Sequence, residues 1–101
     1  MRDRDTLRAR RLAHEAARVA NDEVVAANCR LAASSLGHAP QIHSDEIRAT
    51  ILEDCAHHLA EAIATGSPAV RSRARDAQQL LVVVQDPRAP SPSDFDREVR
   101  P

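Results

Sequence analysis

The sequence predicts an all-α fold, an alanine-rich three-helix bundle followed by a proline-rich tail. Apolar residues recur every three or four positions in three segments, which is the spacing of one helix face. Two breaks, "SLGHAPQIHSDE" and "TGSPAV", separate the segments and combine glycine, proline and helix-capping residues. Four of the six prolines come after residue 85, where the helical spacing stops. We therefore expect a helical domain over residues 1–85 and a tail over 86–101.

The first helix is expected over residues 5–36. Its main apolar stripe continues across Asn21 and consists of Ala9, Ala13, Ala16, Ala17, Ala20, Val24, Ala27 and Leu31. This continuity favours one long helix, with a break near Asn21 as the alternative. A second apolar face appears only in the C-terminal half, at Val25, Cys29, Ala32 and Leu36. A helix that is apolar on two sides needs two sets of neighbours.

The second helix is expected over residues 45–65. Ser44 is a suitable N-cap, and the acidic residues that follow it suit the positive end of a helix. One broad apolar stripe follows, made of Ile47, Ile51, Leu52, Cys55, Leu59, Ala62 and Ile63. The glycines that follow the first two helices, Gly37 and Gly66, are expected to adopt the left-handed conformation common at helix C-termini.

The third helix is expected over residues 68–85, because Ser67-Pro68 is a typical helix start. Its seam follows alternating steps of four and three: Val70, Ala74, Ala77, Leu81 and Val84. Val82 and Val83 lie off this seam, which indicates a second contact. In the tail, a docked helical turn over residues 94–100 is one reading, since Ser93 could cap it. An unstructured tail is the alternative.

Composition favours a small domain that associates with other molecules. Nineteen of its apolar residues are alanines and Phe95 is the single aromatic residue, so the core is thin and a homodimer is expected. No apolar run is long enough for a transmembrane helix, and the N-terminus lacks the apolar segment of a secretory signal. These features predict a cytoplasmic protein with reduced cysteines and no membrane partner.

The surplus apolar residues of the first and third helices predict the interface. The side chains expected to contact a second copy, or another protein, are Val25, Cys29, Leu36, Leu80, Val82 and Val83.

The stretch "EDCAHH", residues 53–58, divides between two helix faces at about 100° per residue. Cys55 and His58 point inward, where the first is expected to be a small buried hydrophobe and the second to hydrogen-bond Asp54 or an acid of the first helix. The alternative is a site for a first-row transition metal, formed by Cys55 and His58 with Cys29 or Asp54. The outward set, Glu53, His57 and Glu61, is expected to be a solvated face.

The arginines provide a third hypothesis. All 14 basic residues are arginines, and they form one group on the first helix, Arg4, Arg8, Arg11 and Arg18, and another on the third, Arg71 and Arg75 with Arg73 nearby. A two-fold dimer could align them along phosphates. The net charge of −1 and the interleaved acids argue against this reading.

Catalysis is not expected, because the chain has two glycines, no phosphate-binding loop and no nucleophile motif. The sequence thus predicts a small bacterial interaction or regulatory protein without a cofactor. A metal-binding protein and a dimeric DNA-binding regulator are the alternatives.

Overall fold

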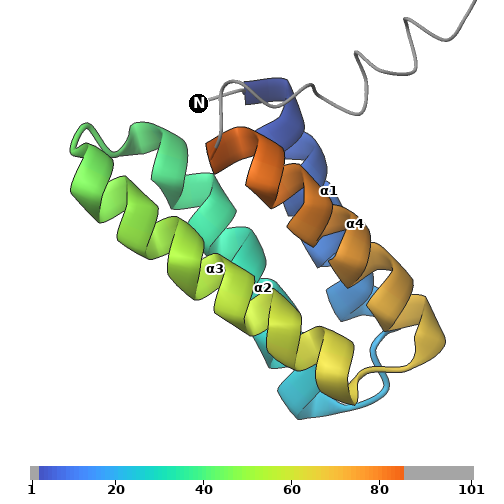
Figure 1. The fold of residues 1–101 in the computed structure, drawn as a ribbon. Coiled ribbons are helices and arrows are strands. Elements are labelled where there is room, and N and C mark those ends of the chain that lie inside the picture. Colours follow the sequence, from blue (N-terminus) through green and yellow to red (C-terminus); the bar gives the residue numbers. More distant parts are fainter. Residues whose placement is uncertain (1–2, 86–101) are drawn as a thin grey trace, which may run out of the picture.

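The computed structural model describes residues 3–85, and within this range the chain is almost entirely helical and contains no strand. It has four α-helices, α1 (Asp3–Val19), α2 (Glu23–His38), α3 (Asp45–Thr65) and α4 (Pro68–Gln85), and one 3₁₀ turn, η1 (Ala39–Gln41) (Figure 1). The all-α prediction is confirmed, but the described part holds four helices rather than three. The predicted tail, with its helical turn at 94–100, lies outside the described residues.

Each helix packs against two others: α1 and α3 both contact α2 and α4, but α1 and α3 are not neighbours. In Figure 1, α1 and α4 form one side of the molecule and α2 and α3 the other, and the two pairs diverge from the end that carries the α1–α2 and α3–α4 connections. The Cα atoms extend over 39 × 38 × 17 Å, so the bundle is two helices thick.

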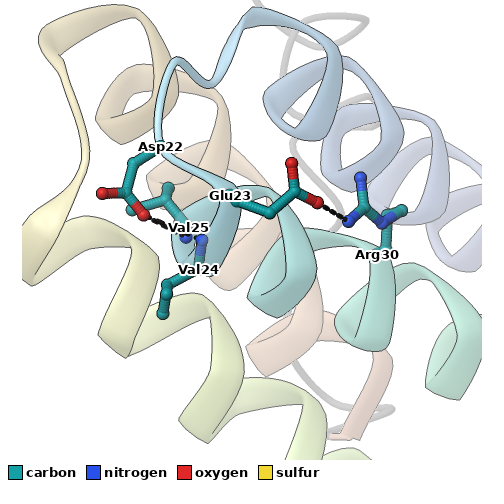
Figure 2. A network of polar contacts seen from close by, with 5 residues as sticks. All are labelled: Asp22, Glu23, Val24, Val25 and Arg30. Atoms are coloured by element: carbon teal, nitrogen blue, oxygen red, sulfur yellow. Dashed lines mark hydrogen bonds and ion pairs between the residues drawn. The ribbon is translucent and has the colours of Figure 1, made fainter.

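The single long helix favoured by the sequence is wrong, because the chain breaks between Val19 and Glu23. Asp22 is the N-cap of α2: its backbone is extended (φ −102°, ψ 131°), and its Oδ1 accepts hydrogen bonds from the backbone N–H groups of Val24 (2.8 Å) and Val25 (3.2 Å) (Figure 2). An Asp side chain satisfies these otherwise unpaired donors well, and therefore a new helix starts here.

The break decides which face of α2 is buried. The second apolar face, Val25, Cys29, Ala32 and Leu36, lies in the core. Val24 and Leu31, which the sequence placed on the main stripe, are 70% and 51% exposed.

The core combines small side chains from α1 with larger ones from the other helices. Helix α1 buries Ala9, Ala13 and Ala16 completely, and small residues allow neighbouring helices to approach closely. The largest side chains that are fully buried come from α2, α3 and α4: Leu36, Leu59, Leu81, Val70, Cys29 and Cys55.

The α2–α3 turn is fixed by polar contacts at the start of α3. The Ser44 hydroxyl accepts a hydrogen bond from the Ile47 N–H at 3.3 Å, which confirms the predicted cap. The Arg48 guanidinium donates to the Ile42 carbonyl at 2.6 Å and pairs with Asp45 at 2.8 Å, so one side chain joins the turn to the helix.

The left-handed conformation predicted for Gly37 and Gly66 is wrong, because no described residue has a positive φ. Gly37 lies inside α2, where a Cβ atom would meet the Arg10 guanidinium at 3.3 Å. Gly66 has φ −82°, and a Cβ there would lie 2.5 Å from the Ala62 carbonyl oxygen and 2.7 Å from Cγ1 of Val70. Close packing between α3 and α4, rather than handedness, therefore explains Gly66.

Candidate association surface

Five of the six side chains predicted to form an interface are buried inside one copy of the chain. The buried residues are Val25, Cys29, Leu36, Leu80 and Val83, with 8% exposure or less, whereas Val82 is 62% exposed. Their neighbours lie within the same copy, in which each helix packs against two others. The predicted surface is therefore wrong, although a homodimer stays a prediction.

The large apolar side chains that are exposed within residues 3–85 are Leu7 on α1, Val24 and Leu31 on α2, Ile47 on α3 and Val82 on α4. Among the described helices, only α2 exposes two of them, and both lie on its outer face. Val24 and Leu31 are seven residues apart, two helical turns, and so lie on the same face, with half-buried Ala27 between them. We call these three residues the α2 strip. Its charged border is one ion pair, in which Arg30 donates to Glu23 at 2.7 Å (Figure 2).

The α2 strip was missed because the apolar stripe was assigned as though the helix were continuous. The sequence does carry a signal for the break: Asn21-Asp22-Glu23 combines a capping residue with an acid in the first turn. When a helix is started at Glu23, the apolar face of α2 is assigned independently of the apolar face of α1.

The predicted metal ligands do not converge. The Cys55 thiol donates to the Ala32 carbonyl at 3.4 Å, and His58 Nδ1 lies 3.0 Å from Oδ1 of Asn28. Asp54 is exposed, so the predicted Asp54–His58 contact is replaced by an Asn28–His58 hydrogen bond between α2 and α3. Within residues 3–85 there is no group of three or more His, Cys, Asp or Glu side chains arranged to hold a metal ion.

Both cysteines are fully buried and are not in a disulfide. Burial raises the pKa of the Cys55 thiol to about 12. It also raises the pKa of Cys29, although the nearby Arg30 charge lowers it in part. Both thiols are therefore protonated at neutral pH, as expected for core residues rather than nucleophiles.

The outward set of α3, Glu53, His57 and Glu61, is exposed as predicted. The His57 ring contacts that of His58 edge-on, with 6.2 Å between the ring centroids.

The two arginine groups lie on neighbouring helices, and Asp76 stands between Arg8 and the α4 group because it lines the hollows beside both. Arg4, Arg8, Arg11 and Arg18 are exposed on α1. On α4, Arg73 faces α1, where its Nε lies 3.8 Å from Glu15, whereas Arg71 and Arg75 line a hollow of about 330 Å³ beside Asp76. Positions two apart on a helix differ by about 200°, so Arg71 and Arg75 point away from the α1 contact. One copy does not join the two groups into a single stripe.

Comparisons of the chain with protein-family models, with curated proteins and with solved structures found no match. None of the helices formed by residues 3–85 is long and apolar enough to span a membrane.

Proposed function

We propose that this protein is a non-enzymatic interaction protein that acts as a homodimer through the α2 strip. The observation that carries the proposal is that α2, alone among the described helices, exposes two large apolar side chains on one face, Val24 and Leu31. The prediction of an apolar association surface is thereby kept, but its residues are different.

A second copy suits the α2 strip because the acidic and basic residues of α2 itself are balanced. Helix α2 contains one acidic residue and one arginine, Glu23 and Arg30, seven residues apart. In an antiparallel two-fold contact between two α2 helices, Glu23 of one copy comes close to Arg30 of the other, and the reverse. The same charges that pair within one copy can therefore pair between copies, while Val24 and Leu31 become buried.

The dimer should be weak, because one helix face buries a small area and small interfaces are typical of transient complexes. Sedimentation velocity from about 10 μM to 1 mM tests it, at ionic strength near 0.5 M to screen other charge contacts. We expect a concentration-dependent monomer–dimer equilibrium that shifts at least tenfold towards monomer in the Val24→Ser/Leu31→Ser variant.

Val82→Ser is the matched control, because Val82 is 62% exposed on α4, away from the α2 strip. This variant should dimerise like the wild type. A wild-type protein that stays monomeric up to 1 mM, or a double variant that dimerises as strongly as the control, contradicts the proposed function.

A further inference from the structure

The charges of the bundle are divided between its two halves. Helices α1 and α4 together hold eight arginines and four acidic residues, whereas α2 and α3 together hold two arginines and six acidic residues. These pairs are the two sides of the molecule in Figure 1, blue with orange and green with yellow. Despite the net charge of −1, one half of the bundle is therefore positively charged and the other half negatively charged.

Most of this difference in charge comes from two rows of exposed side chains, one row positive and the other negative. Arg4, Arg11 and Arg18 follow each other at steps of seven on α1, and we call them the arginine row. Glu46, Glu53 and Glu61 follow at steps of seven and eight on α3, and we call them the glutamate row. At about 1.5 Å per residue the rows extend ~21 and ~22 Å, with a charge about every 10–12 Å in each. The two rows match in length and spacing.

On each helix, one charge that could neutralise the row has another partner. Glu15 of α1 pairs with Arg73 of α4 at 3.8 Å, and Arg48 of α3 pairs with Asp45 at 2.8 Å. Among residues 3–85, no member of either row forms an ion pair. The fold also keeps the rows apart, because α1 and α3 are diagonal in the bundle and their outer faces point to opposite sides.

From this complementarity we propose that the arginine row of one copy docks on the glutamate row of a second copy. A molecule bound through its arginine row leaves its glutamate row exposed on the opposite side. The contact is therefore heterologous, and it produces a ring or an open chain instead of a closed two-fold dimer. Its residues differ from those of the α2 strip, although Arg18 of the row and Arg30 beside the strip line the same hollow.

Salt separates this contact from the dimer formed by the α2 strip. Attraction between exposed rows of opposite charge weakens strongly once the screening length falls below the ~10–12 Å between neighbouring charges in a row, whereas apolar burial does not. In sedimentation velocity at about 20 mM salt, we expect species larger than a dimer, and at about 300 mM at least tenfold weaker association into them. The Val24→Ser/Leu31→Ser variant should still associate at low salt, so failure of either surface can be recognised separately.

Charge reversal provides the decisive test. One variant carries Arg4→Glu, Arg11→Glu and Arg18→Glu, and the other carries Glu46→Arg, Glu53→Arg and Glu61→Arg. Each alone has two rows of the same sign and should lose the larger species, whereas an equimolar mixture should regain them. The charge-conserving control carries Arg4→Lys, Arg11→Lys and Arg18→Lys. It should behave as the wild type.

Two results overturn the proposal: a wild type with no species beyond a dimer at low salt, or a mixture of folded reversal variants that does not associate. Circular dichroism establishes that each variant is folded. If the wild type does not associate but binds a double-stranded DNA probe at low salt, and the arginine-row reversal removes that binding, the partner is nucleic acid and the proposed contact is wrong.

Discussion

The N-cap at Asp22 provides the most direct test of the fold, because it separates α1 from α2 and sets the face that α2 exposes. We expect Asp22→Ala to destabilise the protein. The substitution removes the acceptor of two backbone hydrogen bonds, from Val24 at 2.8 Å and Val25 at 3.2 Å, and a negative charge at the positive end of a helix.

The magnitude follows from these two contributions. Replacing an N-cap aspartate by alanine costs about 1 kcal/mol, and the favourable charge–dipole interaction adds about 0.5 kcal/mol at an exposed site. In a domain of this size, 1 kcal/mol shifts the melting temperature by about 4–8 °C. Asp22→Ala should therefore lower Tm by about 6–12 °C. Asp22→Asn keeps the hydrogen-bond acceptor and removes only the charge, so it should lower Tm by only about 2–4 °C.

Thermal unfolding followed by circular dichroism at 222 nm measures these shifts. Asp54→Ala removes the same charge from an exposed helical position without a cap, and its effect should stay within about 0.5 kcal/mol. The reasoning is refuted if Asp22→Ala melts within about 1 °C of the wild type, because packing alone would then hold the break.

Three further predictions concern close packing and burial. Gly66→Ala should lower the free energy of unfolding by about 1–3 kcal/mol, because its Cβ would lie 2.5 Å from the Ala62 carbonyl oxygen. Gly37→Ala should keep or raise the free energy of unfolding, since only the flexible Arg10 side chain must move and alanine favours helix. Urea titrations measure both changes. Burial raises the pKa of Cys55 from 9.0 to about 12, so the unfolded chain loses this proton first. The stability it contributes is complete below pH ~9 and declines towards pH 12, and urea titrations at pH 8 and 10.5 should show a smaller decline in Cys55→Ala than in the wild type. Equal declines would contradict this assignment.

Spacing and capping predicted the helical class and the start of α3 and α4 correctly, because these signals are local. Ser44 and Ser67-Pro68 mark the two starts, and the structure begins α3 at Asp45 and α4 at Pro68. The same local signal was present at Asp22, but an apolar stripe that happened to continue across Asn21 outweighed it. The spacing of apolar residues shows which of them share a helix face only within one uninterrupted helix.

The candidate sites depended on which helices meet, and a single sequence does not give this information. Cys55 and His58 were placed correctly on the inner side of α3, yet their partners, the Ala32 carbonyl and the Asn28 amide, lie across the α2–α3 contact. The predicted interface failed for a related reason. A bundle of three helices leaves Val25, Leu36 and Val83 without enough neighbours, but one copy of the four-helix arrangement buries all three.

The packing of α1 against two neighbouring helices has a consequence for local opening. Helix α1 carries none of the largest fully buried side chains, but it packs against both α2 and α4, so its release would also uncover apolar side chains of those two helices. Helix α1 should therefore stay docked until the packing of its neighbours is lost as well. Backbone amides of residues 6–19 should then exchange with solvent only as the molecule unfolds as a whole.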